Sequence, residues 1–246
     1  EQIHNIVNHS ESKMLFVGDV VATEINAEEM PSLEGIVYLP DFSLNLSRSE
    51  RLTYAREHLN EIFGHKYPKY FRKEHIKYHV DDPEELAMIN YTSGTTGFSK
   101  GVMLPYRALW GNLDYLMDTV KPKIGKNCNI LSTLPMAHMY GLMTEFIFNI
   151  VLGNHFCFLT RQPSPTLISE ALNETKPDII FAVPLVIDKI VRKHVFPRVQ
   201  TNWVRLLTNM PVLSKRIKEK IREFVLGEFG KHPYEVVVGG APLNKE

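Results

Sequence analysis

Residues 91–101 combine glycines, hydroxyl side chains and a lysine in the pattern of a phosphate-binding loop. They read Tyr-Thr-Ser-Gly-Thr-Thr-Gly-Phe-Ser-Lys-Gly. Glycines let backbone N–H groups turn toward an anion, the hydroxyls add donors, and Lys100 adds a cation that neutralises triphosphate charge. A strand pattern precedes this loop and a helical pattern follows it, as phosphate binding requires. The loop therefore predicts a nucleotide-phosphate site, and a plain polar turn is the structural alternative.

The loop of the P-loop NTPases, G-x-x-x-x-G-K-[ST], is a poor match to this segment. Gly94 and Lys100 fit that pattern, but Ser99 stands where its second glycine belongs. Gly101 stands where its magnesium-binding hydroxyl belongs. The mismatches disfavour an ordinary P-loop NTPase.

Two later segments also have residues suited to a ligand site. Residues 134–141, Leu-Pro-Met-Ala-His-Met-Tyr-Gly, place His138 where a predicted strand gives way to a helix. Residues 237–243, Val-Val-Gly-Gly-Ala-Pro-Leu, end an apolar strand in a glycine turn, at the edge where open α/β sheets bind ligands. A histidine that caps a helix, and a glycine turn that only reverses the chain, are the structural alternatives.

Residues 91–101 resemble the Y-T-S-G-T-T-G-x-P-K-G signature of the AMP-forming acyl-activating enzymes, which include acyl-CoA synthetases, luciferases and peptide-synthetase adenylation domains. Ser99 replaces the usual proline, which removes a restraint on φ but no phosphate donor. The segments around His138 and Gly239 are similar to two further motifs of this family, in the expected order. The resemblance therefore covers most of the chain, and it is closest to long-chain fatty-acid:CoA ligases.

The resemblance implies a two-step reaction. A carboxylate attacks the α-phosphate of Mg-ATP to give an acyl-adenylate and pyrophosphate, and CoA then displaces AMP. Lys100 would stabilise the reacting charges, Thr92 would contact Mg²⁺, and His138 and Gly240 would line the acyl pocket. The ATP contacts implied are Thr92, Ser93, Gly94, Thr95, Thr96, Gly97, Lys100, Gly239, Gly240, Ala241 and Pro242. The cofactors implied are ATP, Mg²⁺ and CoA.

The carboxylate substrate is open between classes. A fatty acid leads because the Gly-Gly-Ala-Pro-Leu turn and the helical insertion at residues 196–230 resemble long-chain enzymes. An amino acid would require an acidic residue early in the helix after His138, and Glu145 lies well into it. An aryl acid is a further alternative. A non-catalytic nucleotide- or acyl-binding module is the alternative of another class, and only Ser99 favours it.

The helix expected at residues 139–152 is apolar on nearly every face, which indicates either burial all round or a groove for a hydrocarbon chain. Within this helix, residues 140–145 superficially resemble the Y-G-x-T-E magnesium motif of the family, but they are one residue longer than that motif. That family motif also follows the glycine turn, whereas these residues precede it. We therefore expect residues 140–145 to be part of the helix and not a magnesium site.

Short apolar runs alternate with helical patterns, which predicts an α/β fold with mostly parallel sheets flanked by helices, in two packed lobes of an adenylating domain. The acidic, proline-containing residues 81–85 suggest a boundary between a lobe segment at 1–82 and a second at 83–246, which carries the phosphate loop. A capping box at Ser47 and Glu50 predicts a helix that ends near Gly64. The predicted strands are Lys13–Val17, Gly35–Leu39, Ala87–Thr92, Asn129–Leu134, His155–Thr160, Asp178–Val183 and Tyr234–Val238.

The charge and cysteine content of the chain limit the classes of partner that we expect. The chain has 28 Lys and Arg against 28 Asp and Glu, so no global field favours nucleic acid, and its two cysteines show no CxxC spacing. A cytoplasmic location is the expectation. The helix expected at residues 213–229 has a basic face that we interpret as solvated, with peripheral contact to lipid headgroups or a carrier as the alternative. Nothing indicates an oligomeric state.

Both ends of the sequence lie in helical patterns. We therefore expect a fragment of the large N-terminal domain that does not turn over by itself. The magnesium carboxylate, the ribose-binding aspartate and the C-terminal lysine of the family would come later in the full-length protein.

Overall fold

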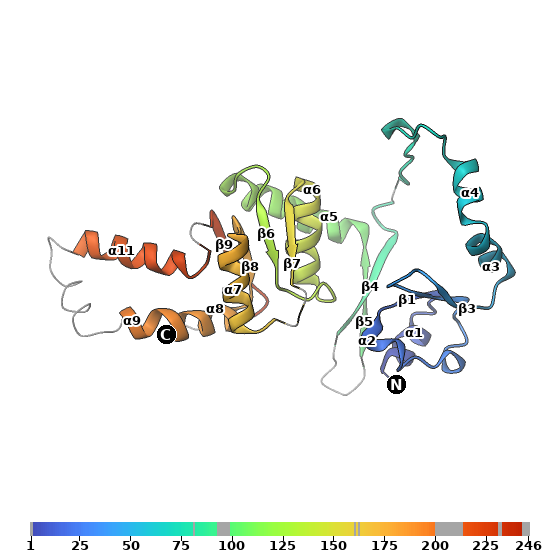
Figure 1. Cartoon of the computed structure of the whole chain (residues 1–246), viewed down its shortest axis with the longest axis horizontal. Coiled ribbons are helices and arrows are strands. Elements are labelled where there is room, and N and C mark those ends of the chain that lie inside the picture. Colours follow the sequence, from blue (N-terminus) through green and yellow to red (C-terminus); the bar gives the residue numbers. More distant parts are fainter. Residues whose placement is uncertain are drawn as a thin grey trace. The chain divides into compact units, whose positions relative to one another are not determined.

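The computed structural model describes residues 2–80, 82–92, 99–159, 161, 163–199, 214–230 and 233–242. Contacts group the chain into two units, Glu1–Pro105 and Tyr106–Glu246, which are described separately (Figure 1). The lobe boundary expected between residues 82 and 83 stays a prediction. Within the described residues, every helix is too short or too polar to cross a bilayer.

The first unit is built around a three-stranded sheet with the order β1-β2-β3. Strand β1 pairs in parallel with β2, and β2 pairs antiparallel with β3. Val7, Val17, Met30, Leu33 and Ile36 form its buried core. The elements are α1 (Gln2–His9), β1 (Met14–Val17), α2 (Asp19–Ala22), η1 (Ala27–Glu29), β2 (Gly35–Tyr38), β3 (Leu44–Ser47), α3 (Glu50–Glu57), α4 (Leu59–Lys66) and η2 (Lys73–His75).

The capping box predicted at Ser47 is wrong. Ser47 is the last residue of β3, and the helix begins after Ser49, whose side chain makes no capping hydrogen bond. The Ser47 hydroxyl instead donates to the Ser49 carbonyl at 3.0 Å and accepts from Thr53 Oγ1 at 2.7 Å. The predicted helix is also interrupted at His58, and its second half runs past Gly64 to Lys66.

Strand β4 (Leu86–Thr92) and strand β5 (Lys100–Pro105) form an antiparallel hairpin. The sequence suggested a strand, a loop and a helix in direct succession, and this expectation is wrong. The apolar residues 102–104 pair with β4 instead of belonging to the connection. Helix α5 (Tyr106–Thr119) begins only after this second strand. The phosphate loop is therefore the connection of a hairpin, and no helix N-terminus follows it directly.

The second unit has a four-stranded parallel sheet with the order β7-β6-β8-β9. Its strands are β6 (Asn129–Ser132), β7 (His155–Phe158), β8 (Ile179–Ala182) and β9 (Glu235–Val238). Every predicted strand is present, and among the described residues only β3 and β5 were missed. The remaining elements are η3 (Lys121–Lys123), the π-helical η4 (Gly141–Ile147), α6 (Phe148–Leu152), α7 (Pro165–Thr175), α8 (Pro184–Ile190), the π-helical η5 (Val191–Val195), α9 (Phe196–Val199) and α11 (Ser214–Gly227).

Neighbouring residues of the central strands point to opposite faces of this sheet, and helices cover both faces. Ile130 and Phe181 pack with Leu116 and Phe148, which come from α5 and α6. Leu131, Ile180 and Ala182 pack with residues of α7 and α8 on the other face. Burial on both faces explains why these strands are continuously apolar in sequence. The predicted α/β class, with a parallel sheet flanked by helices, is confirmed.

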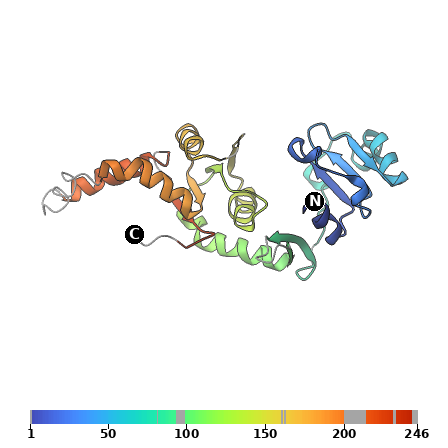
Figure 2. The same cartoon turned by 90° about the horizontal axis from the view of Figure 1, so that it is seen from below.

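The predicted helix at residues 213–229 is also confirmed, as α11. It lies beside the continuous helical run of α8, η5 and α9 (Figures 1 and 2). Arg198 of α9 stacks over the Phe224 ring with 5.0 Å to its centroid, and its Nη1 lies 3.9 Å from Glu228 Oε1.

Candidate functional site

The predicted phosphate loop lies mostly outside the described residues. Ser93, Gly94, Thr95, Thr96 and Gly97 are not described by the structure, and their ATP contacts stay predictions.

Thr92 and Lys100 are described, and they are direct partners across the β4–β5 ladder. Side chains directly opposite in an antiparallel pair lie on the same face of the ladder. Both side chains are exposed. The predicted magnesium contact and the predicted cation therefore stand together where the two strands enter the loop.

Helix α1 holds both sides of this loop. His9 Nδ1 lies 2.8 Å from Tyr91 Oη, and the two rings meet edge to face with centroids 5.7 Å apart. Gln2 Nε2 donates to Ser99 Oγ at 3.3 Å, so the residue that replaces the proline of the family signature gains a partner. Sequence reasoning missed His9 and Gln2, because they belong to no motif and act only through contacts with a distant segment.

Three strand ends meet at the carboxyl edge of the parallel sheet in the second unit. The segment with His138 follows β6, Val183 follows β8, and the Gly239–Pro242 turn follows β9. Strand β6 connects to β7 on one side, while β8 and β9 lie on its other side. The chain order therefore reverses between β6 and β8, the place where open α/β sheets form a ligand crevice.

Tyr140 joins the two predicted motifs of this edge. Its hydroxyl donates to the Val237 carbonyl at 3.1 Å, and its ring covers Gly239, where a Cβ atom would lie 2.8 Å from the ring. Gly240 has a φ of 82°, which glycine adopts without strain. Burial, with a smaller effect of the Glu145 charge, raises the pKa of Tyr140 to about 12, so the phenol keeps its proton at neutral pH.

Glu145 fixes the chain where β6 ends. Its carboxylate is fully buried and accepts hydrogen bonds from Ser132 Oγ at 2.9 Å, from Thr133 N at 3.1 Å and from Leu134 N at 3.0 Å. Burial raises the pKa of this carboxyl, although the donors of Leu134 and Thr133 oppose the shift. Its helical setting is as expected from the sequence, but its role as an anchor was missed, because it depends on a tertiary contact.

The helix after His138 begins at Met139 and runs to Leu152, as predicted, but residues 141–147 are π-helical. The buried Asn149 side chain donates to the carbonyls of Thr144 at 2.8 Å and Glu145 at 2.9 Å. Its Oδ1 accepts from Asn154 Nδ2 at 2.9 Å. This network satisfies carbonyls inside the wide turns, and π-helical turns are frequent at functional sites.

His138 itself is exposed, and its N–H donates to the Pro135 carbonyl at 3.0 Å in the turn before the helix. At Gly141, a Cβ atom would lie 2.6 Å from the Pro135 oxygen, so glycine allows the helix to start against this turn. The acyl-pocket role of His138 stays a prediction, as do the ATP contacts of Gly239, Gly240, Ala241 and Pro242. Among the described residues, no group of three or more His, Cys, Asp or Glu side chains is placed to hold a metal ion.

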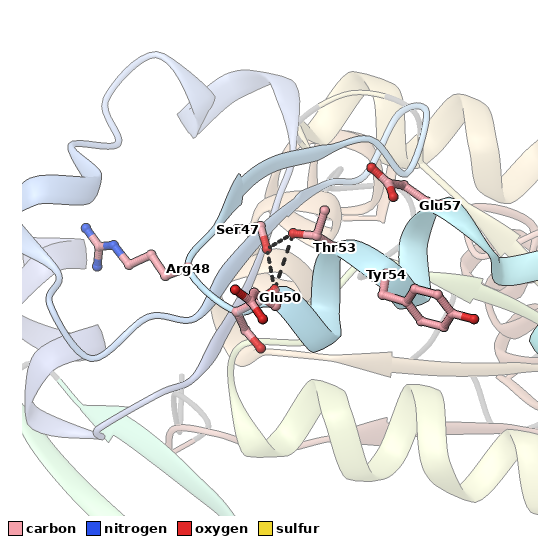
Figure 3. Close-up of a pocket in the computed structure, with 7 residues that line it drawn as sticks. Ser47, Arg48, Glu50, Thr53, Tyr54 and Glu57 are labelled. Carbon is pink, nitrogen blue, oxygen red and sulfur yellow. Dashed lines mark hydrogen bonds between the residues drawn. The ribbon is translucent and has the colours of Figure 1, made fainter.

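A surface hollow of about 440 Å³ lies in the first unit, between β3 and α3 (Figure 3). None of the predicted site residues lines it. In Figure 3 the Ser47 and Thr53 hydroxyls are hydrogen-bonded to each other, and Arg48 points away from them. The Arg48 guanidinium donates to the carbonyls of Met30 and Ala27, each at 2.9 Å. Because ligand sites need convergent polar groups, this hollow is not a candidate site.

Comparison with curated proteins gives relatives of two substrate classes. The chain is 25% identical over 199 residues to a probable 4-coumarate–CoA ligase 1 of Dictyostelium discoideum, covering 78% of this chain and 35% of the relative. It is 31% identical over 169 residues to long-chain-fatty-acid–CoA ligase 4 of Saccharomyces cerevisiae, covering 61% of this chain and 24% of the relative. The chain thus spans about a third or less of the length of these relatives.

Comparison with solved structures shows the same fold. A red-emitting luciferase from Phrixothrix hirtus superposes with a TM-score of 0.65 at 18% identity, covering 99% of this chain and 39% of the luciferase chain. ATP-bound MatB from Rhodopseudomonas palustris superposes with a TM-score of 0.56 at 20% identity, covering 98% of this chain and 38% of the MatB chain.

The family model described as AMP-binding enzyme matches residues 1–246. This match covers the hairpin with Thr92 and Lys100 as well as the sheet edge where Tyr140 meets Gly239. The chain therefore belongs to the family of AMP-binding enzymes.

Proposed function

We propose that the protein containing these residues activates a fatty acid with ATP, releases pyrophosphate, and passes the acyl group from the acyl-adenylate to CoA. One observation carries the proposal most strongly. Tyr140 brings the His138 segment and the Gly239–Pro242 turn together at the switch point of the parallel sheet. These segments lie far apart in sequence, so their meeting supports a shared ligand crevice.

The hairpin would supply the phosphate site. Thr92 and Lys100 present a hydroxyl and a cation on one exposed face, which suits a triphosphate and a hard cation such as Mg²⁺. Mg²⁺ would neutralise part of the triphosphate charge. Lys100 would stabilise negative charge on the phosphate oxygens as the carboxylate attacks, because such reactions depend mainly on positioning and preorganised charge.

The sheet edge would supply the adenine and acyl contacts. Gly239 and Gly240 have no side chains that would block a flat ring such as adenine. The Tyr140 ring packs against the Gly239 backbone. His138 is exposed at the start of the helix and is free to face a substrate. Glu145 holds the preceding turn, so His138 starts from a fixed backbone.

A fatty acid is the leading substrate because residues 196–230, of which the structure describes α9 and α11 as helices, resemble the helical insertion of long-chain enzymes. The yeast relative is titled a long-chain-fatty-acid–CoA ligase. An aryl acid is the second candidate, since the relative from Dictyostelium is titled a 4-coumarate–CoA ligase.

The test uses the full-length protein with ATP, Mg²⁺ and hydroxylamine, which traps acyl-adenylates as hydroxamates. Palmitate, 4-coumarate and a panel of amino acids are compared at equal concentration. We expect hydroxamate with palmitate, and palmitoyl-CoA when CoA replaces hydroxylamine. Product with 4-coumarate alone would assign an aryl acid. Saturable ATP binding without product from any acid would overturn the enzyme assignment in favour of a binding module.

A further inference from the structure

Helix α4 has an apolar stripe that is exposed. Leu59, Ile62 and Phe63 have the spacing that normally turns one face of a helix toward a core. Their exposed fractions are nevertheless 53%, 38% and 59%. Helix α4 and the residues that follow it project from the β1–β3 sheet in Figure 1. The apolar residues of this stripe are therefore available to contact another molecule or a membrane.

Aromatic rings continue this stripe beyond the helix. Phe63, Tyr67 and Phe71 form a ladder with centroid distances of 4.7 and 5.3 Å, and His75 follows at 5.9 Å. Tyr70 beside the ladder is 78% exposed. Large exposed apolar groups in a contiguous row mark surfaces that bind a partner or a membrane.

The same segment is locally basic in a chain of zero net charge. Residues 59–80 contain five Lys or Arg against two Glu, a net charge of +3, with three further histidines. Lys66 lies over the Tyr67 ring, 5.5 Å from its centroid. Lys69, Arg72 and Lys73 are exposed between the aromatic residues. Positive charge and aromatic side chains are therefore interleaved on one segment.

We propose that residues 59–80, which we name the basic aromatic surface, dock on the surface of an anionic lipid bilayer. Tyrosine and phenylalanine insert their rings at the headgroup level, while lysine and arginine are attracted to anionic headgroups. An acidic protein groove is a less suitable partner, because the exposed apolar groups run along the segment and do not form one compact anchor. The proposal does not depend on the proposed catalytic function.

The experiment measures co-sedimentation of the 246-residue chain with vesicles of phosphatidylcholine alone or with 30 mol% phosphatidylglycerol, at low and high salt. We expect binding only to the anionic vesicles, weakened by salt. Lys69→Gln with Lys73→Gln should lower the partition coefficient by roughly fivefold per residue. Tyr70→Ser with Phe71→Ser should lower it by roughly tenfold or more, because the rings lose apolar burial.

The matched controls change equivalent groups elsewhere. Lys218→Gln with Lys220→Gln removes two exposed charges of α11, and Tyr115→Ser removes a tyrosine of α5 that is 65% exposed. Both controls should bind like the wild type. Thermal unfolding of each variant checks that the exposed substitutions leave the fold intact.

Three outcomes would overturn the proposal. The first is that wild-type chain stays in solution with anionic vesicles. The second is a loss of specificity. Either the Lys218 and Lys220 variant loses as much vesicle binding as the Lys69 and Lys73 variant, or the Tyr70 and Phe71 variant binds like the wild type, and the attraction to the vesicles would then not depend on the basic aromatic surface. The third is self-association in sedimentation velocity that the Phe71 variant abolishes, together with no vesicle binding, since the surface would then pair with a second copy.

Discussion

Replacing Glu145 with alanine removes the acceptor that holds the chain at the end of β6. Four donors lose their partner, namely Ser132 Oγ, Thr133 N, Thr133 Oγ1 and Leu134 N. Each buried donor left without a partner costs about 1–3 kcal/mol. Thr133 and Leu134 are only partly buried, so water can reach some of these donors and lowers the cost of losing Glu145. The expected loss in the free energy of unfolding is about 2–4 kcal/mol.

Urea unfolding, followed by circular dichroism, measures this loss. Glu145→Gln keeps one acceptor oxygen and should lose only about 1–2 kcal/mol. Glu223→Ala is the matched control, because this side chain of α11 is exposed and its removal should change stability by about 0.5 kcal/mol or less. If Glu145→Ala unfolds at the same urea concentration as the control, the anchoring role derived from its hydrogen bonds is refuted.

Three further predictions concern the same edge of the sheet. Burial raises the pKa of the Glu145 carboxyl above its unfolded value near 4.5. The contribution of Glu145 to the free energy of unfolding is therefore largest at acid pH and declines as the pH rises through the folded pKa. In urea titrations between pH 4 and 8, Glu145→Gln should flatten this decline. Gly239→Ala should destabilise by about 1–3 kcal/mol, because its Cβ would meet the Tyr140 ring at 2.8 Å, and Tyr140→Ala in the same chain should make the two changes less than additive; full additivity would contradict the contact. Bulky replacements of His138 and Met139 should alter the chain-length profile of the full-length enzyme, and an unchanged profile would remove both residues from the acyl pocket.

The parallel sheet could be predicted from sequence because its signals are local. Ile179–Ala182 is apolar at every position, as burial on both faces requires, and Ser164 before Pro165 marks the start of α7, where its hydroxyl accepts from Leu167 N at 3.2 Å. Two strands among the described residues had weaker signals and were missed. Leu44–Ser47 contains a polar residue in the middle, and Lys100–Pro105 follows a glycine loop and contains Gly101.

The geometry of the candidate site depends on contacts that the sequence does not encode locally. The register that sets Thr92 opposite Lys100 arises from pairing across the loop. Tyr140 contacts Gly239 and Val237 because β9 pairs with β8 in the parallel sheet. Ser47 shows the converse, since a correct local capping pattern failed where its hydroxyl found partners in Ser49 and Thr53.

Exchange of labelled pyrophosphate into ATP by the full-length protein, measured with palmitate present or absent, tests the proposed acid activation most directly. We expect exchange that requires palmitate, falls by roughly 30-fold to 1,000-fold in Lys100→Ala, and is unchanged in Lys126→Ala, whose side chain is exposed in the second unit. Lys100→Ala should keep the wild-type melting temperature, because the side chain lies exposed at the start of β5. Palmitate-dependent exchange that survives undiminished in Lys100→Ala would contradict the assignment of this hairpin as the phosphate site.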